Sequence, residues 1–572
     1  MAKVADVFVE TLVKAGVNRI YGIAGDSLNG LTDSIRAHDG IDWMMVRHEE
    51  VAAFAAGGES QITGNLTVCA GSCGPGNLHL INGLHDCQRS RVPVLAIAAQ
   101  IPSSEIGTNY FQETRPEHLF MTCSDFCEVV STPEQIPRVL AIAMRTAIAK
   151  RCVAVLIIPG DILTRESSSP AIDLGISGPA ETVLPPVASL NSAADLLNKT
   201  KAVTILAGAG CAMARAEVLA VAEILQAPII SALRGKEYLE YDNPYYVGLN
   251  GLIGMTSAYR AMQECDTLLM LGTDFPYSQF FPQEINVIQL DLRGEQIGRR
   301  TKIDVGLIGD ARHTLQALAP LLKKHKSGHL DDCLKQFRKV RKEFDNLAVG
   351  EPGETPIHPQ YLTKCISELA AEDAVFLCDV GTPTTWSARY LRMNGRRRLI
   401  GSFSHGTMAN AMPQAIGVQA SDRARQVVSL SGDGGLSMLM GDILTLRQLE
   451  LNIKIVVFNN GALGFVEQEM KAAGIQNYGT AFRSQNFADV AIAAGIQGWR
   501  VDTPEQVAPA LSEAFAHPGP ALIDVAVARQ ELSLPPNLSL AQSAGFNLYM
   551  MKAILHGDGH EVLDMAKTNL WH

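Results

Sequence analysis

Short apolar runs and helix-like segments alternate along most of this chain. The runs are four to six residues long, rich in Val, Ile and Leu, and bounded by Gly, Pro, Asp or Asn. Such runs predict strands that are buried on both faces, and their alternation with helices predicts parallel sheets of the α/β class. The expected strands are 19–22, 66–70, 94–98, 154–158, 202–206, 374–377, 426–431, 453–458 and 522–527.

The length of the chain predicts several domains. Its 572 residues exceed what a single compact core holds. Residues 167–186 are rich in Ser, Gly and Pro and predict a linker, and a charged helical segment at 330–346 precedes a second Gly- and Pro-rich stretch. We therefore expect three open parallel-sheet α/β domains, at residues 1–182, 183–334 and 335–530, followed by an amphipathic C-terminal tail at 531–572.

Composition and charge exclude some classes of protein. Apolar residues make up 47% of the chain and charged residues 19%, as in ordinary globular proteins. The net charge is -11 without a long basic run, so nucleic acid is not an expected partner. The first residues lack the pattern of a signal peptide, and no apolar run approaches the roughly 18 residues of a membrane span, which predicts a cytoplasmic protein. The 11 cysteines form no CxxC pair, so we expect buried free thiols.

The most specific chemistry lies in a strand, helix and strand between Arg425 and Asn460. The first strand ends in Gly432-Asp433-Gly434-Gly435, a helical segment over 436–449 follows, and the second strand ends in Asn459-Asn460. A right-handed crossover places both strand ends at one edge of the sheet, where Asp433 and Asn460 can face one another. Their oxygens suit Mg²⁺ with a diphosphate, and the glycines and the helix start let the backbone approach the phosphate.

The spacing around this unit makes it specific. GDG alone is a common turn, and a second copy, Gly557-Asp558-Gly559, follows a helical pattern with too little chain after it for another such unit. The first copy is followed by the 24 residues 435–458 and then by NN, with strands at both ends. This arrangement resembles the signature of enzymes that use thiamine diphosphate.

Further motifs extend the resemblance over the whole chain. They are RHEEVAAFAAG, CAGSCGPGNLHLINGL, IPSSEIG, YFQET, ALRGKE, CDVGTPT, SLSGDGG, FNN and LGFV. Together they resemble the bacterial pyruvate oxidases that pass electrons to a quinone, a branch of the thiamine diphosphate-dependent enzymes. The resemblance implies pyrimidine-binding, FAD-binding and diphosphate-binding domains, in that order.

Arg47-His48-Glu49-Glu50 opens an Ala-rich helix. Two glutamates in a first helical turn ordinarily complement the helix dipole. In the family, one buried carboxylate bonds the ring nitrogen N1′ of the cofactor's aminopyrimidine, so that the cofactor can remove its own proton from C2. Adjacent helical residues point about 100° apart, so only one glutamate can serve. The family pattern assigns this role to Glu49 and leaves Glu50 structural.

The resemblance also assigns the other residues of this site by position. Gly406, Thr407 and Met408 would hold the aminopyrimidine, and Met408 would wedge the cofactor into its bent shape. The metal would be held by Asp433, Asn460 and the backbone carbonyl of Ala462, since some relatives carry a Gln side chain at that third position. The expected neighbours of the diphosphate are Gly434, Gly435, Gly461, Leu463, Gly464, Phe465 and Val466. The residues expected to line the reacting carbon are Phe111, Gln112, Phe465 and Glu469, although core and solvent roles stay open for all four.

The second domain contains weaker signals for a flavin. Gly208-Ala-Gly210 resembles half of a dinucleotide fingerprint, but Met213 stands where a third Gly or Ala belongs, so a plain strand-helix turn is the simpler interpretation. Other stretches resemble the flavin domain of the family, and Asp291 just beyond a strand could bond a ribose hydroxyl. The expected FAD-binding residues are Gly251, Leu252, Ile253, Gly254, Asp274, Phe275, Pro276, Tyr277, Ser278, Asp291 and Leu292.

The resemblance implies a homotetramer that carries thiamine diphosphate, Mg²⁺ and FAD on each chain. Pyruvate would be converted to acetate and CO₂, with electrons passing through the flavin to ubiquinone. Three alternatives stay open: a carboligase of the acetohydroxyacid synthase type, a phosphate-dependent oxidase that makes acetyl phosphate and peroxide, and an inactive flavin-holding scaffold. Intact Glu49, Asp433 and Asn460 argue against the scaffold.

The tail contains two amphipathic segments, 540–555 and 561–572. On a helical wheel the second has an apolar side of Val562, Leu563, Met565, Ala566 and Leu570, and a polar side of Glu561, Asp564, Lys567 and Thr568. Such a face most often packs against its own domain, but this one lies beyond the last strand and ends near Trp571, which suits a membrane interface. Our hypothesis is that the tail covers the active-site entrance, is released when pyruvate reduces the flavin, and then binds lipid at the inner face of the cell membrane.

Overall fold

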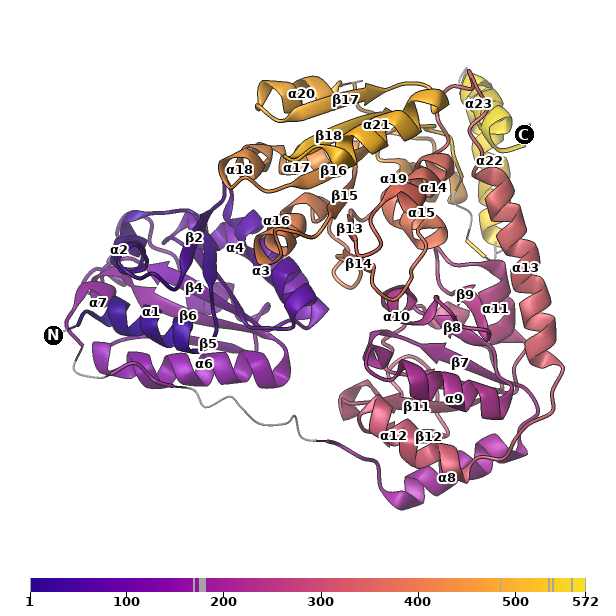
Figure 1. Ribbon diagram of the computed structural model, residues 1–572, viewed down its shortest axis with the longest axis horizontal. Coiled ribbons are helices and arrows are strands. Elements are labelled where there is room, and N and C mark those ends of the chain that lie inside the picture. The colour runs from indigo at the N-terminus through magenta and orange to yellow at the C-terminus, as the bar shows by residue number, and fades with distance from the viewer. Residues whose placement is uncertain are drawn as a thin grey trace.

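The computed structural model describes residues 2–167, 170–173, 182–483, 485–532, 535–536, 540–556 and 559–570. Three separate parallel sheets of six strands each follow one another along the chain (Figure 1). This confirms the α/β class with three open parallel sheets. Much of the expected linker at 167–186, together with Asp558 and Trp571, lies outside the described residues.

The N-terminal sheet has the strand order β2-β1-β3-β4-β6-β5. Its strands are β1 Arg19–Gly22, β2 Asp42–Met45, β3 Thr67–Gly71, β4 Val94–Gln100, β5 Phe126–Val129 and β6 Val153–Pro159. The helices of this part are α1 Val4–Lys14, η1 Asp26–Leu28, α2 Asn29–Arg36, α3 Glu49–Thr63, α4 Pro75–Ser90, α5 Pro116–Leu119, η2 Pro133–Gln135, α6 Ile136–Lys150 and α7 Gly160–Thr164.

The middle sheet has the strand order β12-β11-β10-β7-β8-β9. Its strands are β7 Val203–Ala207, β8 Ile229–Ser231, β9 Tyr246–Leu249, β10 Thr267–Leu271, β11 Asn286–Asp291 and β12 Val305–Ile308. The helices around it are α8 Val187–Lys199, η3 Ala209–Cys211, α9 Arg215–Leu225, η4 Leu233–Gly235, α10 Lys236–Leu239, α11 Thr256–Gln263, η5 Ser278–Phe280, η6 Gly294–Gln296, α12 Ala311–Leu318, η7 Ala319–Leu321 and α13 His329–Leu347.

The C-terminal sheet has the strand order β14-β13-β15-β16-β18-β17. Its strands are β13 Val375–Cys378, β14 Arg398–Gly401, β15 Val427–Gly432, β16 Ile453–Asn459, β17 Gln497–Val501 and β18 Ala521–Ala526. Its helices are α14 Pro359–Leu369, α15 Thr382–Tyr390, α16 Ala411–Ser421, α17 Asp433–Met438, η8 Met440–Asp442, α18 Ile443–Gln448, α19 Gly464–Ala472, α20 Phe487–Ala493 and α21 Pro504–Ala516.

The order of the strands distinguishes the middle sheet from its neighbours. Numbered within each sheet, the N-terminal and C-terminal sheets share one order, whereas the middle sheet has the order typical of dinucleotide-binding domains. In such a sheet, ligands bind outside the carboxyl ends of the strands, where successive crossovers diverge. For the middle sheet this point lies between β7 and β10, and for the C-terminal sheet it lies between β13 and β15.

Each sheet is buried on both faces because successive strand residues point to opposite sides. In the middle sheet, Ile205 packs in one core cluster with α8, α9 and α12, while Leu206 packs in another with α11 and α13. One cluster runs without interruption from the N-terminal sheet, through α3, α4 and α16, to the C-terminal sheet. The first and third sheets therefore share a core, as their closeness in Figure 1 shows.

Small residues allow α3 and α16 to cross closely between these two sheets. A Cβ atom at Gly58 would overlap the carbonyl oxygen of Gln414, and one at Gly417 would overlap that of Ala55. Glycine and alanine are therefore required on this face of α3, because larger side chains would push the two helices apart. The crossing fixes the start of α3, where Glu49 lies, relative to the C-terminal sheet.

Two helices follow the last strand: α22, Leu540–His556, and α23, Gly559–Leu570. They lie beside the C-terminal sheet near the upper end of α13 (Figure 1). On α23, Met565 is buried, but Leu563, which the helical wheel placed on the same apolar side, is 56% exposed. Within the described parts of the chain, no helix is both long and apolar enough to cross a membrane.

The helical segment expected over 436–449 is interrupted in the structure. The structure divides this segment into α17, η8 and α18, because Leu439 leaves the helical region with φ -124°. Asp442 then accepts the backbone N–H of Arg47 at 2.9 Å and the hydroxyl of Thr445 at 2.7 Å. This contact with the N-terminal part of the chain outweighs the local helical preference.

Candidate active site

Two polar side chains lie in neighbouring loops at the carboxyl edge of the C-terminal sheet. Asp433 directly follows β15, and Asn460 follows the adjacent strand β16. Asp433 Oδ2 accepts the N–H of Gly461 at 2.7 Å, and Asn460 Oδ1 accepts the N–H of Ala462 at 3.0 Å. Each of these oxygens keeps a second lone pair. With the carbonyls of the Asn460 loop they form a set of hard oxygen donors, which is the kind that Mg²⁺ prefers.

The charge state of Asp433 fits a cation site. Its side chain is buried, and this burial raises the pKa of Asp433 to about 6. A bound cation would favour the charged carboxylate and offset the cost of burying it. In the part of the chain that the structure describes, no cluster of three His, Cys, Asp or Glu side chains offers a different metal site.

The start of α17 beside Asp433 has room only for glycine. A Cβ at Gly434 would lie 2.9 Å from Leu463 Cδ2, and one at Gly435 would overlap Oδ2 of Asp379. Asp379 directly follows the neighbouring strand β13; its Oδ1 accepts the N–H of Ala411, and its buried Oδ2 has no hydrogen-bond partner among the described residues. Burial raises the pKa of Asp379 to about 7. These glycines allow a phosphate group to approach the backbone closely.

Glu49 lies at the start of α3 with its side chain buried. Its Oε2 atom is 2.9 Å from Nδ1 of His79 on α4, and its Oε1 atom would be 3.0 Å from a Cβ at Gly76. The His79 ring stacks on His48 with 4.3 Å between ring centroids. Burial and the neighbouring His79 lower the pKa of His48. One carboxylate oxygen is thus held by an imidazole, while glycine keeps the space beside the other oxygen open.

Glu50 is bound differently from Glu49. Its Oε1 accepts a hydrogen bond from Asn82 Nδ2 at 2.7 Å, and the same nitrogen lies 3.1 Å from Thr407 Oγ1. Asn82 Oδ1 is 2.8 Å from Nε2 of His405. Asn82 of α4 therefore connects the start of α3 with the 405–408 loop of the C-terminal part. Met408 in this loop is half-buried, and its carbonyl accepts the Thr407 hydroxyl at 2.9 Å.

The residues expected around the reacting carbon fall on two elements. Phe111 and Gln112 lie on the loop after β4, where Phe111 is 77% exposed and Gln112 accepts from the thiol of Cys73 at 3.4 Å. Phe465 and Glu469 lie on α19; Phe465 is half-buried and Glu469 is exposed. Among the residues that the structure describes, no hydrogen bond joins the two elements.

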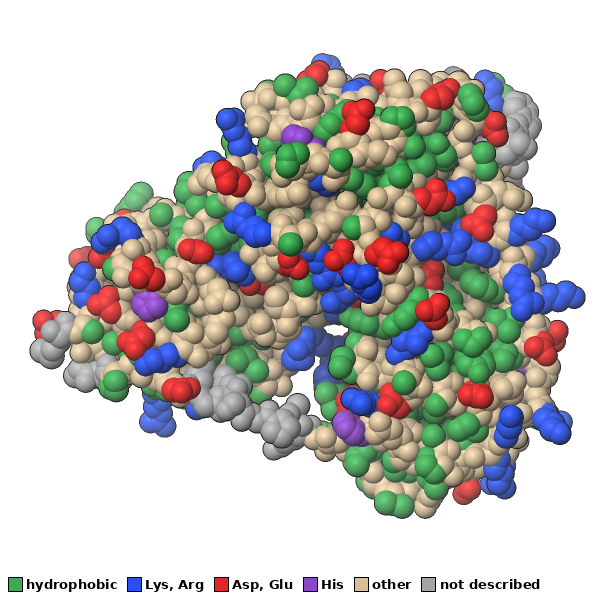
Figure 2. All heavy atoms as spheres, viewed as in Figure 1, with side chains coloured by type: hydrophobic (Ala, Val, Ile, Leu, Met, Phe, Trp, Pro, Cys, Tyr) green, Lys and Arg blue, Asp and Glu red, His purple; other side chains and the backbone are tan. Residues whose placement is uncertain are grey.

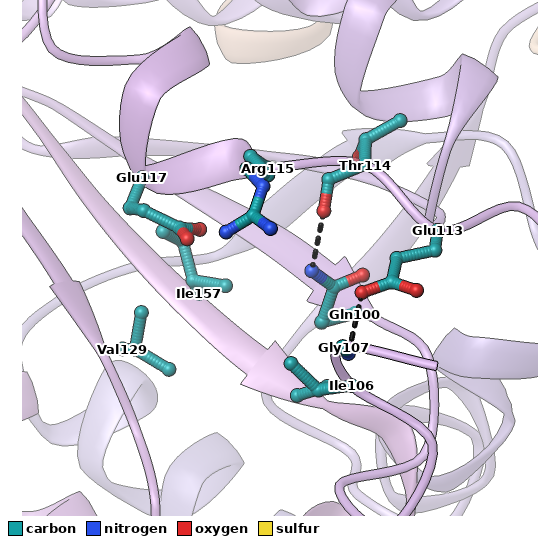
Figure 3. Close-up of a pocket in the computed structure, with 9 residues that line it drawn as sticks. All are labelled: Gln100, Ile106, Gly107, Glu113, Thr114, Arg115, Glu117, Val129 and Ile157. Atoms are coloured by element: carbon teal, nitrogen blue, oxygen red, sulfur yellow. Dashed lines mark hydrogen bonds between the residues drawn. The ribbon is translucent and has the colours of Figure 1, made fainter. Parts of the chain in front are cut away.

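A pocket opens under the loop that carries Phe111 (Figure 3). Gln100 at the end of β4 donates to the carbonyl of Thr114 at 3.1 Å, and the side chains of Arg115 and Glu117 reach toward the space from above. The residues that line it are Gln100, Ile106, Gly107, Glu113, Thr114, Arg115, Glu117, Val129 and Ile157. Glu113 holds the loop in shape by accepting the N–H groups of Gly107 and Tyr110, which lowers the pKa of Glu113.

Helix α19 is anchored by a buried charge network. Glu467 is 1% exposed, and its Oε1 accepts from Arg529 at 2.5 Å and from Thr480 at 2.8 Å. The Lys471 ammonium lies 3.9 Å from Glu467 Oε2 and 5.5 Å from the centre of the Tyr549 ring, which belongs to α22. The helix that begins four residues after Asn460 is therefore packed directly against the C-terminal tail.

The residues expected to bind a flavin gather at the carboxyl edge of the middle sheet. Gly251, after β9, has φ +117°, and a Cβ there would lie 3.2–3.3 Å from the rings of Tyr277 and Phe275, which follow β10. Leu252 is 36% exposed and Leu292 is 57% exposed. Pro276 and Ser278 flank Tyr277 in the segment after β10. The sequence segments 251–254 and 274–278 are thus neighbours in space.

Charged side chains surround this edge. Asp291 ends β11 with its carboxylate buried; it accepts the N–H of Arg293 at 3.0 Å, and burial raises the pKa of Asp291. Asp274 pairs with Arg91 at the end of α4 and lies 3.4 Å from Arg293. Figure 2 shows a hollow between the N-terminal and middle parts of the molecule with Lys and Arg side chains beside it. The edge can therefore attract an anionic nucleotide.

The glycine turn after β7 packs closely and does not form a full fingerprint. Gly210 donates to the carbonyl of Gly272 at 2.9 Å, and Met213 is 78% exposed. The close approach of the ends of β7 and β10 explains the two glycines without a ligand. Sequence reasoning missed His79, Asn82, Asp379 and Arg91. His79 and Asn82 are three residues apart on α4, and this helical spacing was the available signal for a shared face.

Three models of thiamine pyrophosphate enzyme domains match this chain. The N-terminal TPP binding domain matches residues 2–119, the central domain 190–318, and the C-terminal TPP binding domain 379–525. The putative thiamine pyrophosphate-containing protein YdaP of Bacillus subtilis is 36% identical over 98% of this chain and 97% of its own length. Pyruvate oxidase of Lactiplantibacillus plantarum is 30% identical over 91% and 87%, and acetolactate synthase isozyme 2 large subunit of Escherichia coli is 31% identical over 91% and 94%.

Proposed function

This chain belongs to the thiamine pyrophosphate enzyme family, and we propose that it oxidises pyruvate to acetate and CO₂ and passes the electrons through FAD to ubiquinone. Pyruvate as substrate is suggested by the relatives named as pyruvate oxidase and acetolactate synthase. The proposed cofactors are thiamine diphosphate, Mg²⁺ and FAD. The proposed assembly is a homotetramer that is cytoplasmic at rest and peripheral on the inner face of the cell membrane when activated.

The C-terminal edge fits thiamine diphosphate and Mg²⁺. Asp433, Asn460 and the carbonyl of Ala462 would hold the metal, and the backbone at Gly434 and Gly435 would receive the diphosphate. When bound, thiamine diphosphate supplies an electron-accepting thiazolium for decarboxylation of a 2-oxo acid. Gly434 itself has no room for a side chain, because a Cβ there would lie 2.9 Å from Leu463 Cδ2 and 3.0 Å from the Phe482 ring.

Glu49 would hold a proton at N1′ of the aminopyrimidine. Its burial keeps water from competing for the carboxylate, and the His79 imidazole at 2.9 Å fixes the orientation of the carboxylate. Phe111 and Phe465 would exclude water from the substrate, while Gln112 and Glu469 would bind its polar atoms. Glu50, bound to Asn82, would hold the pyrimidine-binding loop in place.

The middle sheet fits FAD as the electron acceptor. Its strand order is the one typical of dinucleotide binding, and Asp291 ends a strand where a ribose hydroxyl would lie. The neighbouring segments around Gly251 and Tyr277 would line the flavin side by side.

The observation that carries the quinone-linked proposal is the docking of the tail on α19. Lys471 on α19 faces the ring of Tyr549, whose hydroxyl donates to Glu561 on α23 at 2.6 Å. Lys552 on α22 donates to the carbonyl of Gly474 at 2.8 Å. A rearrangement near Phe465 and Glu469 would therefore act on the tail directly, as release upon reduction requires.

The surface of α22 supports the lipid-binding role. The large apolar side chains on its outer side are 57–82% exposed, namely Met551, Ile554 and Leu555. These residues, and not those of α23 that the helical wheel selected, present the larger exposed apolar face. Such a face would bind the interfacial region of a bilayer when the tail leaves α19.

A spectrum of the purified protein tests the proposal. With pyruvate under nitrogen, we expect the yellow flavin to bleach and a quinone analogue to restore the colour. Restoration by oxygen with formation of acetyl phosphate would instead support the phosphate-dependent oxidase. Acetolactate without bleaching would support the carboligase, and bound flavin without any product would support the scaffold.

A further inference from the structure

Helix α15 connects the diphosphate edge of the C-terminal sheet with the middle domain. It begins just after Asp379 and Gly381 and is buried along nearly its whole length. Near its start, the Thr382 methyl group would lie 3.4 Å from a Cβ at Gly464, the first residue of α19. A nine-residue helix spans about 13 Å, so the far end of α15 lies well away from the metal donors.

At that far end, the side chain of Arg389 reaches into the middle domain. Its Nε donates to the carbonyl oxygen of Ile253 at 3.1 Å, and its Nη2 lies 3.4 Å from that of Gly254. The guanidinium also lies over the ring of Phe344 at 5.4 Å, and the Arg389 carbonyl accepts from Arg341 at 2.7 Å. Only 9% of Arg389 is exposed, so both bonds form in a site protected from water.

The loop that receives these bonds is closed at its base, where the N–H of Met255 donates to the carbonyl of Leu249 at 2.8 Å. It is a turn in which the N–H of Gly254 donates to the carbonyl of Gly251 at 2.9 Å, and it contains two glycines. Glycine gives a loop many accessible backbone conformations, so contacts with other parts of the protein are needed to fix the loop in one of them. Arg389 contacts one side of this loop, while the rings of Phe275 and Tyr277 lie on the side of Gly251.

We propose that Arg389 is a positioning residue, which fixes the 251–254 loop for flavin binding and joins it to the helix that starts beside the diphosphate. The inference rests on the proposed function for the identity of the ligand, a flavin dinucleotide. The planar guanidinium can bond two carbonyl oxygens at fixed angles, whereas an ammonium group cannot hold both in the same way. Burial lowers the pKa of Arg389 to about 10, so the side chain stays cationic at neutral pH.

The test compares Arg389→Met, Arg389→Lys and Arg392→Met in the full chain. Arg392 lies three residues beyond Arg389, is half exposed, and its side chain pairs with Asp345 at 3.2 Å, so it is a matched control. FAD affinity is measured by fluorescence of free flavin added to protein that holds thiamine diphosphate and Mg²⁺. We expect affinity to fall roughly tenfold in Arg389→Met and to recover in part in Arg389→Lys, with no change in Arg392→Met.

A second measurement separates this inference from the proposed function. Hydrogen exchange of the 251–256 amides, without FAD, should be faster in Arg389→Met and normal in Arg392→Met, while thiamine diphosphate affinity is unchanged. If the unaltered protein binds no FAD, the flavin function fails, but faster exchange still supports positioning of the loop. Unchanged exchange in Arg389→Met, or an equal loss of affinity for both cofactors, would overturn the inference.

Discussion

His79 Nδ1 lies 2.9 Å from Glu49 Oε2, so the proposed proton-holding carboxylate is anchored by a helix of its own domain. The neighbouring carboxylate, Glu50, is instead bound to Asn82 and through it to the 405–408 loop. Two adjacent glutamates in one helical turn thus have different partners, because successive helical side chains diverge by about 100°. This difference supports separate roles for the two residues.

Glu49→Gln should retain the fold and both cofactors but lose most flavin reduction by pyruvate. The amide cannot hold the proton at N1′, and loss of such a group typically slows a reaction about 10²–10⁴-fold. Stopped-flow absorbance of the flavin measures the rate. Glu50→Gln is the control and should retain most of the rate, since an amide can still bond Asn82. The reverse pattern would show that the family position was assigned to the wrong neighbour.

Asp433→Ala should release thiamine diphosphate and Mg²⁺. The change removes the charged metal ligand and leaves the N–H of Gly461 without its acceptor, so affinity should fall at least about 100-fold. Equilibrium dialysis at fixed Mg²⁺ gives the affinity. Asp558→Ala, in the second GDG of the sequence, is the matched control and should bind normally. Equal affinities in the two variants would remove Asp433 from the metal site.

The parts of the site that are formed by residues close together in sequence could be predicted, whereas contacts between distant segments could not. The Asp433 and Asn460 loops could be placed because a single crossover fixes adjacent parallel strands, and the structure joins them through Gly461. The contact of Asn82 with Thr407 spans 325 positions of sequence. It depends on the close crossing of α3 and α16, and no local pattern in the sequence encodes such a crossing.

The segment at 436–449 also shows that a contact with a distant part of the chain cannot be predicted from the local sequence pattern. Its helical pattern is real, but the helix is interrupted at Leu439, and Asp442 then bonds the backbone of Arg47 in another domain. In the tail, periodicity identified both helices but not which face is covered. The docking of Tyr549 and the exposure of Leu563 depend on the shape of α19, which the tail sequence does not contain.

Asp86 should make the contact between the N-terminal and C-terminal sheets sensitive to pH. It is fully buried, accepts from Ser402 at 2.7 Å and Gln414 at 2.8 Å, and burial raises its pKa to about 6. The folded state therefore binds a proton more tightly than the unfolded state, whose aspartate titrates near ~3.9. The contribution of Asp86 to stability is therefore complete below about pH 3.9 and is lost as the pH rises to about 6.

Asp86→Asn removes this titration. The free energy of unfolding of the variant minus that of the unaltered protein should increase by up to about 3 kcal/mol between about pH 4 and pH 7. Any effect of the substitution that does not depend on pH shifts this difference equally at every pH. Thermal unfolding of both proteins across this range measures the difference. Asp39→Asn, an exposed aspartate of the same domain, should show a constant difference. A stability difference for Asp86→Asn that does not change with pH would mean that burial does not raise the pKa of Asp86.

Gly545 allows α22 to lie directly on α19. A Cβ at this position would overlap the carbonyl oxygen of Ala472, so Gly545→Val should push the tail away while leaving the sheets intact. If the outer apolar face of α22 binds lipid once it is free, this variant should float with anionic lipid vesicles even without pyruvate. The unaltered protein should require pyruvate, and a chain truncated after Pro536 should not float at all.

Ala544→Val is the matched control, because Ala544 is the preceding residue of α22 and is exposed. It should behave like the unaltered protein, which separates added apolar volume from undocking. Trypsin cleavage after Lys552 reports undocking independently of lipid, since that side chain is held by the carbonyl of Gly474 in the docked state. Rapid cleavage of Gly545→Val without flotation would show that release alone does not create a lipid-binding surface. The tail would then serve to close the site around α19, and membrane attachment would have to come from another part of the chain.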